Sequence, residues 1–94
     1  MRSRYSAYAL RLERYLLDTW HADTRPPRLE LAPTTKWLGL KLLDGAQTAP
    51  DRAEVEFVAR YREGGGSAVR LQERSRFVRE EGRWYYVDGD PPGP

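Results

Sequence analysis

The sequence SRFVREEGRWYYVDGD, residues 75–90, is the clearest indication of the fold class, because it is typical of two β-strands joined by a tight turn at Glu81-Gly82. Further strand-like runs cover residues 37–43, 54–62 and 68–79, and the last strand covers residues 83–88. Turn-forming residues separate these runs at positions 44–45, 49–51, 64–66 and 81–82. Connections this short join antiparallel strands, so the pattern predicts a four-stranded antiparallel meander.

The length of the turn at residues 81–82 sets which side chains of the last hairpin share a face. A two-residue turn places Phe77 opposite Tyr86 and Ser75 opposite Asp88. The side chains that then face the same way as Phe77 are Trp84, Tyr86 and Asp88. A three-residue turn reverses the order and puts Tyr85 and Val87 on that face instead. We predict the two-residue turn.

Residues 3–20 show a helical pattern ahead of the strands. Mostly apolar side chains recur at three- and four-residue steps and form one stripe: Tyr5, Tyr8, Ala9, Leu12, Tyr15, Leu16, Thr19 and Trp20. Ser3 is the expected N-cap, a break at residues 11–13 would give two short helices, and the prolines that follow end the helical region. Residues 28–36 form a connector, with one expected helical turn at residues 33–36.

Helices followed by a meander predict an α+β fold, in which the N-terminal helices pack on a bent four-stranded antiparallel sheet. We expect a single domain over residues 1–90. The remaining residues, 91–94, read PPGP and are predicted to be a disordered tail.

Alternation along the middle hairpin assigns an apolar face and a charged face. The apolar face carries Val55, Phe57, Ala59 and Tyr61 on one strand and Val69, Leu71, Glu73, Ser75 and Phe77 on the next. The charged face carries Arg60, Arg62, Arg70, Arg74 and Arg76, with Glu54 and Glu56 available for cross-strand ion pairs. Glu73 is the anomaly, because a carboxylate on an apolar face is costly unless it is paired, hydrogen-bonded or protonated.

The composition of the chain argues against several classes of site and partner. The chain has 94 residues, a net charge of +2 and no cysteine, so no disulfide or cysteine-based zinc site is expected. No apolar run reaches the length of about 18 residues that a membrane span needs, and we expect a cytoplasmic protein. The charge excess is small and the basic face also holds acids, so nucleic acid is an unlikely partner. We expect no cofactor and no metal.

Five blocks of this chain resemble the YchJ family of bacterial proteins: RSRYSAYAL, DTWH, WLGL, VEFVARYR and SRFVREEGRWYYVDG. The resemblance covers nearly the whole chain. It implies the fold of the family's central domain, which is similar to nuclear transport factor 2 and forms a cone of helices packed into a strongly bent sheet. Family members typically carry cysteine-rich SEC-C motifs upstream of the first block. Because this chain has no cysteine, the resemblance implies no zinc-dependent role.

Three residues are candidates for catalysis. Glu73 is a possible general base, because apolar walls raise the pKa of an inward carboxylate; the alternative is a structural anchor. His21 is either an acid–base partner or a residue that favours a helix C-terminus. Asp88 either faces the pocket or starts an Asp-Gly turn. The expected pocket lining is Tyr8, Trp20, Trp37, Phe57, Tyr61, Ser75, Phe77, Trp84 and Tyr86.

The family has no assigned activity, so function is read from these residues alone. The favoured hypothesis is a binding or interaction module that dimerises through the exposed sheet face and holds packed aromatics or a small apolar ligand in its cone. The alternative is an isomerase- or hydratase-type enzyme with Glu73 as the base, which rests on analogy between folds.

Overall fold

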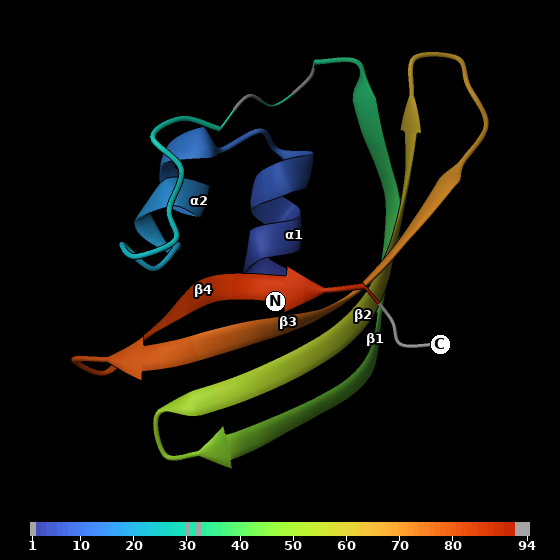
Figure 1. Ribbon diagram of the computed structural model, residues 1–94. Helices are drawn as coiled ribbons and strands as arrows, with labels where there is room; N and C mark the ends of the chain where they lie inside the picture. The colour runs from blue at the N-terminus through green and yellow to red at the C-terminus, as the bar shows by residue number, and fades with distance from the viewer. Residues whose placement is uncertain (1, 30, 32, 92–94) are drawn as a thin grey trace.

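The computed structural model describes residues 2–29, 31 and 33–91. Its elements follow the order α1 (Arg2–Ala9), α2 (Glu13–Asp18), β1 (Thr35–Ala49), β2 (Arg52–Glu63), β3 (Val69–Glu80) and β4 (Arg83–Asp90). The strands form one antiparallel sheet in the order β1-β2-β3-β4. The sheet bends strongly, and both helices lie on its concave side (Figure 1). The predicted α+β class and four-stranded meander are confirmed; most of the predicted tail, residues 92–94, lies outside the described residues.

The helical region is two short helices, as a break at residues 11–13 would produce. Arg11 has a φ of 56°, a left-handed conformation that cannot continue a right-handed helix. The predicted N-cap at Ser3 is wrong, because α1 already includes Arg2 and Ser3 lies inside its first turn.

The segment after α2 leaves the helix to join the sheet. Tyr86 donates its backbone N–H to the carbonyl of Thr19 at 2.8 Å, and His21 donates to the carbonyl of Tyr86 at 2.7 Å. Trp20 thereby forms a parallel bridge with Tyr86 at the outer edge of β4. The helical pattern predicted through Trp20 therefore ends two residues early, because these backbone groups bond to β4 instead.

Strand β1 is longer than predicted at both ends. Thr35 and Lys36 pair with β2, so the helical turn expected at residues 33–36 is wrong for these two. Asp44 and Gly45 also pair with β2, and the turn expected there is wrong. The register shifts along β1 show why: irregularities after Trp37, Leu42 and Gln47 absorb extra residues within the strand, so the chain bends without leaving the sheet.

The hairpin between β3 and β4 confirms the two-residue turn. Glu80 pairs with Arg83, and the turn residues Glu81 and Gly82 have φ values of 53° and 78°. Positive φ at both central residues is the type I′ pattern, which matches the twist of a hairpin. Phe77 pairs with Tyr86 as predicted.

One predicted pair in this hairpin is wrong. A register shift between Arg76 and Phe77 brings Gly89, not Asp88, opposite Ser75. Asp88 turns to the outer face, where it accepts a hydrogen bond from Arg76 Nε at 2.6 Å. The extra residue in β4 reverses the facing of the residues beyond it, which the turn length alone does not reveal.

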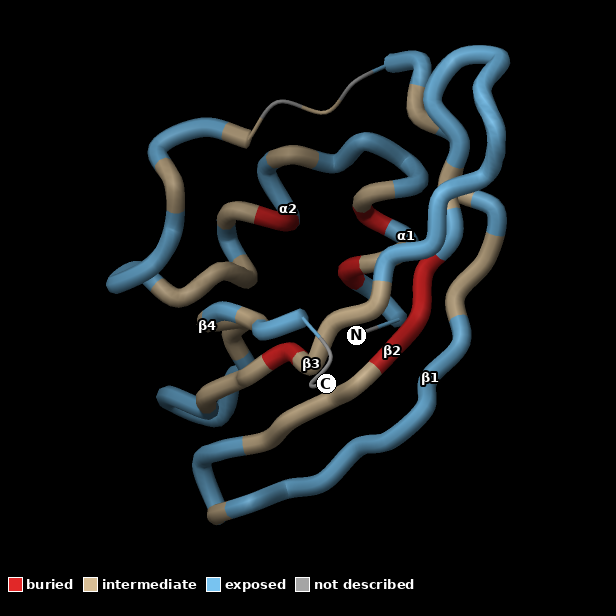
Figure 2. The backbone as a smooth tube through the Cα atoms, turned by 45° about the vertical axis from the view of Figure 1, so that its right-hand side comes forward, coloured by how far each residue is buried: buried red, intermediate tan, exposed pale blue. Residues whose placement is uncertain are grey.

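The core lies where the helices meet the middle of the sheet. Figure 2 shows buried residues on α1, α2, β2 and β3 around the same interior. The fully or nearly buried residues facing it include Ala7, Leu16, Phe57, Ala59 and Ser75. The apolar face of β2 and β3 is the one predicted, since Val55, Phe57 and Ala59 pair with Ser75, Glu73 and Leu71.

The outer face carries the cross-strand ion pairs expected there. Arg74 contacts Glu54 at 2.6 Å, Asp44 at 3.1 Å and Glu56 at 3.5 Å. Arg76 pairs with Asp88 and Asp90. Its hydrogen bond and positive charge lower the pKa of Asp90.

Gly89 has no room for a side chain. A Cβ atom at this position would overlap the carboxyl group of Glu73. We expect Gly89→Ala to lower the free energy of unfolding by about 1–3 kcal/mol, because the carboxyl group of Glu73 must move and give up its hydrogen bonds inside the fold. Urea unfolding followed by circular dichroism measures this.

The matched control is Gly39→Ala in β1, where an added Cβ meets no atom within 4 Å. We expect it to leave stability unchanged or to raise it slightly, since alanine restricts the unfolded chain more than glycine does. Equal losses in the two variants would contradict the close approach of Gly89 to Glu73.

Candidate functional site

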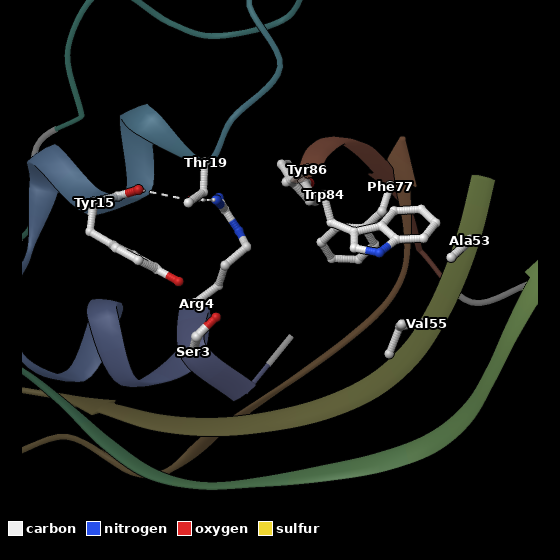
Figure 3. Close-up of a pocket in the computed structure, with 9 residues that line it drawn as sticks. All are labelled: Ser3, Arg4, Tyr15, Thr19, Ala53, Val55, Phe77, Trp84 and Tyr86. Carbon is white, nitrogen blue, oxygen red and sulfur yellow. Dashed lines mark hydrogen bonds between the residues drawn. The ribbon is translucent and has the colours of Figure 1, made fainter. Parts of the chain in front are cut away.

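Two hollows open on the concave side of the sheet, and they share Arg4 and Tyr86. One has a volume of about 270 Å³ and is called the Trp84 hollow (Figure 3). It is lined by the helical-side residues Ser3, Arg4, Tyr15 and Thr19 and by the strand residues Ala53, Val55, Phe77, Trp84 and Tyr86. The other, of about 200 Å³, is called the Glu73 hollow. Its lining is Arg4, Tyr5, Tyr8, Trp37, Phe57, Ala59, Leu71, Glu73 and Tyr86.

Arg4 is a buried cation between the hollows, with 4% of its surface exposed. Its Nη1 donates to the carbonyl of Leu16 at 3.2 Å and to the hydroxyl of Thr19 at 2.7 Å. Leu16 is near the C-terminal end of α2, where helix carbonyls lack partners and carry partial negative charge. Arg4 therefore joins α1 to the end of α2.

Two aromatic rings flank the Arg4 guanidinium. Its central carbon lies 4.6 Å from the ring centre of Tyr86 and 5.3 Å from that of Trp20. The two rings meet edge to face at 5.0 Å. Burial lowers the pKa of Arg4, while the nearby Tyr8 and Tyr86 partly offset this effect. Arginine nevertheless stays protonated in proteins, so the charge is permanent.

The hydrogen-bonding capacity of Arg4 is not used up. Both of its hydrogen bonds of good geometry to the described residues come from Nη1. No carboxylate in the described part of the chain forms an ion pair with it. A guanidinium has five N–H donors in a fixed fork. The hydroxyl of Tyr8 can take one further donor. Of the three N–H groups on Nε and Nη2, at least two then have capacity left for an acceptor placed in a hollow.

Glu73 does face the interior, as predicted, and two hydroxyl groups hold it. Its Oε2 accepts from the hydroxyl of Ser75 at 2.6 Å and from that of Tyr86 at 3.3 Å. Ser75 has no exposed surface. These hydrogen bonds compensate part of the cost of placing a carboxylate beside apolar side chains.

Burial raises the pKa of Tyr86, and the negative charge of Glu73 and their hydrogen bond add to the effect. Burial also raises the pKa of Tyr8, more than the neighbouring Arg4 lowers it. Both hydroxyl groups consequently remain protonated to higher pH than ordinary tyrosines. Tyr86 is a hydrogen-bond donor to Glu73 throughout the neutral range.

The predicted pocket residues divide into three groups. Phe77, Trp84 and Tyr86 line the Trp84 hollow, whereas Tyr8, Trp37, Phe57 and Tyr86 line the Glu73 hollow. Trp37 also packs on Tyr5, Tyr8 and Tyr61 at ring distances of 5.7, 5.8 and 5.3 Å. Tyr61 lines a neighbouring groove, and Ser75 and Trp20 support Glu73 and Tyr86 from outside both hollows.

The three catalytic candidates are not brought together. His21 Nε2 lies 2.8 Å from Glu80 Oε2, and its Nδ1 accepts from the backbone N–H of Asp23 at 3.1 Å. Its ring meets Tyr85, on the side of β4 away from Tyr86. Asp88 pairs with Arg76 on the outer face. Glu73 lines the Glu73 hollow, whereas His21 lines two other grooves, beside Glu80, and neither of the two hollows.

Arg4 was missed by the sequence analysis. The stripe predicted over residues 3–20 did not include Arg4. Two of its members, Ala9 and Leu12, are exposed, whereas the buried residues of α1 are Arg4 and Ala7. A usable signal was present: Arg4 lies three and four residues before Ala7 and Tyr8, on one helical face. That signal is weak for a charged residue, because arginine is seldom fully buried.

In residues 2–29, 31 and 33–91, no three histidine or acidic side chains gather as a metal site would require. None of the described helices has the length and apolar character needed to cross a bilayer.

Comparison with known proteins places this fold. A family model described as the YchJ middle NTF2-like domain matches residues 1–89. A UPF0225 protein of Polaromonas naphthalenivorans is 62% identical over 90 residues, which cover 96% of this chain and 65% of that protein. A UPF0225 protein of Bordetella pertussis is 59% identical over 91 residues, covering 96% and 68% of the two chains.

A solved structure has the same fold over nearly the whole chain. The solution structure of a SEC-C motif containing protein from Rhodopseudomonas palustris matches with a TM-score of 0.87 and 34% identity, covering 99% of this chain and 76% of that one. Helices inside a bent meander thus define an NTF2-like domain. The chain belongs to the YchJ family, as the resemblance implied, and spans 65% of the length of its Polaromonas relative.

The raised pKa of Tyr86 gives a testable pH dependence. An unfolded tyrosine ionises near pH 10, whereas folded Tyr86 holds its proton to higher pH. Its contribution to stability is therefore intact below about pH 10 and is lost as the pH rises above that value. We expect Tyr86→Phe to lose about 0.5–1.5 kcal/mol near neutral pH, through the missing hydrogen bond to Glu73.

Above about pH 10 the stability of Tyr86→Phe should fall less steeply than that of the wild type, because one late-ionising group is gone. Guanidinium unfolding at a series of pH values measures both slopes. Parallel slopes would show that Tyr86 ionises as an ordinary tyrosine.

Proposed function

We propose that this domain is a binding module that holds a small, largely apolar ligand in the Trp84 hollow. The observation that carries the proposal is the division of its lining. Phe77, Trp84 and Val55 form an apolar wall on the sheet, and polar groups of α1 and α2 converge from the other side (Figure 3). Small-molecule sites typically combine an apolar lining with a few convergent polar groups.

Exposure distinguishes this hollow from a packed core. Trp84 faces the concave side, yet 38% of its surface is exposed, and Tyr15 across the hollow is 40% exposed. A side chain packed into a core would be nearly inaccessible. Large aromatic surfaces that face inward and still meet solvent support a site with a vacancy for an apolar group.

Binding is favoured over proton transfer by the surroundings of Glu73. The Oε2 atom of Glu73 accepts two hydrogen bonds within the fold, from Ser75 and Tyr86. A general base also needs a partner acid or polarising group around the same substrate. The expected partners were His21, Asp88 or a tyrosine. His21 and Asp88 contact Glu80 and Arg76 instead, and the tyrosine at hand, Tyr86, donates its hydroxyl to Glu73 itself. These contacts fit a structural role for Glu73 better than a role as a general base.

The neutral probe naphthalene carboxamide tests the binding role. We expect it to shift the amide resonances of residues around Phe77 and Trp84 in ¹H–¹⁵N correlation spectra. Ala53→Leu places a larger side chain into the lining of the hollow and should weaken this binding by about tenfold or more. Ala9→Leu, on the exposed side of α1, is the control and should bind like the wild type.

The proposed site would be contradicted if the amide resonances around Phe77 and Trp84 did not shift at saturating probe. It would also be contradicted if Ala53→Leu bound the probe as tightly as the wild type.

The expected partner protein is a second copy of the chain, joined through the outer face of the sheet. We base this proposal on the separation of charge along that face. One end carries Lys36, Lys41, Arg60, Arg62 and Arg70, none of which forms an ion pair with the described residues. Arg60 and Arg70 lie directly opposite each other, which is unfavourable without a nearby anion.

The other end of the outer face holds the carboxylates. Asp44, Glu54, Glu56, Asp88 and Asp90 surround the two arginines Arg74 and Arg76. A two-fold axis through the face would set the basic end of each copy over the carboxylate end of the other. Closed two-fold dimers use one self-complementary surface, and this face has that property.

Charge reversal tests the dimer. We expect the wild type to sediment as a dimer at low salt and Arg70→Glu to weaken the association by about tenfold or more, since it places like charges across the contact. Arg28→Glu, in the exposed connector, changes the net charge equally and should leave the dimer intact. A monomeric wild type in sedimentation equilibrium would contradict this proposal.

A further inference from the structure

The two hollows differ in charge. Among the described residues that line the Trp84 hollow, Arg4 alone has a permanently charged side chain. The Glu73 hollow contains Arg4 and also the carboxyl group of Glu73. A negatively charged ligand would meet Glu73 in one hollow and no acid in the other. The Trp84 hollow is therefore the more favourable place for an anion.

Arg4 is prepared to accept such a ligand. Only 4% of its surface is exposed, and it has no carboxylate partner among the described residues. Its hydrogen bonds to Leu16 and Thr19 both use Nη1. These bonds and the rings of Tyr86 and Trp20 fix the guanidinium before any ligand arrives. A group held in place in this way loses little conformational entropy on binding. Low local dielectric strengthens its attraction to an anion.

The remaining lining separates polar from apolar groups. Ser3, Tyr15 and Thr19 lie with Arg4 on the helical side, and Phe77, Trp84 and Val55 lie across from them (Figure 3). A ligand that satisfies both sides has an anionic group at one end and a flat apolar body at the other. Aromatic rings suit such a body, because they pack edge to face or offset against other rings.

We propose that the Trp84 hollow binds an aromatic carboxylic acid, with its carboxylate on Arg4 and its ring between Phe77 and Trp84. This inference rests on the proposed binding function and adds the chemical class of the ligand. One cation matches one negative charge. A phosphate carries close to two charges at neutral pH, and its second charge would remain uncompensated in a hollow whose described lining offers no other cation.

The test compares naphthalene carboxylate with naphthalene carboxamide, which have the same shape and differ in charge. Dissociation constants are measured by titration in ¹H–¹⁵N correlation spectra at low salt. Charge-assisted hydrogen bonds are stronger than neutral ones, so we expect the carboxylate to bind about tenfold more tightly than the amide.

Replacing Arg4 itself would remove the link to α2, so a neighbouring position is the better variant. Ser3 lines the hollow and is exposed in the first turn of α1, where an acidic residue is compatible with the helix dipole. We expect Ser3→Asp to compete for Arg4 and to lower the ratio of carboxylate affinity to amide affinity by about tenfold. Ser6→Asp, exposed on the same helix and outside both hollows, should bind both probes like the wild type.

The outcomes separate this inference from the proposed function. Equal binding of the two probes by the wild type, or a carboxylate preference that survives Ser3→Asp, would overturn the carboxylate assignment and leave the binding function standing. Binding of neither probe would overturn both.

Discussion

The buried guanidinium of Arg4 is the constraint on which the arrangement of the helices depends. Each helix is short, with eight residues in α1 and six in α2, and isolated helices of such length are unstable in water. Arg4 supplies a tie between them at the carbonyl of Leu16, and it rests on the ring of Tyr86 in the sheet. A cation placed there also polarises the interior of the cone. The packing of the helices and the proposed ligand recognition thus depend on the same side chain.

The sequence was a good guide to the fold wherever the signal was local. Alternation assigned the faces of β2 and β3, and the Glu81-Gly82 turn predicted that Phe77 pairs with Tyr86. Prediction failed at β1 and at the far end of β4, where register shifts absorb extra residues. A bulge is a response to curvature and to packing against distant segments. Asp44-Gly45 has the composition of a turn, yet it lies within a strand whose neighbour continues past it.

The candidate site was less predictable, because it is made by segments far apart in the sequence. The alternation pattern identified Glu73 as a candidate, because it placed a carboxylate on an apolar face. In the structure Glu73 lies inside, with Ser75 and Tyr86 as its hydrogen-bond partners. Arg4 gave no comparable signal, since an arginine on a short helix is ordinarily solvated. His21 and Asp88 were candidates for catalysis only because of their residue types. Their contacts with Glu80 and Arg76 depend on the exit path of α2 and on the β4 bulge, neither of which local pattern encodes.

The bridge between Trp20 and Tyr86 has a consequence for the order in which the molecule assembles. The contacts between β4 and the segment after α2 join distant parts of the chain. The hydroxyl of Thr24, for example, donates a hydrogen bond to the carbonyl of Val87, 63 positions away. Closing so long a loop costs entropy before the contacts repay it. The hairpins of β2, β3 and β4 can form from neighbouring residues, whereas the ring of Tyr86 meets Arg4 only after the last strand is in place. A chain still emerging from the ribosome, with β4 inside the tunnel, would have most of its sheet and no hollow.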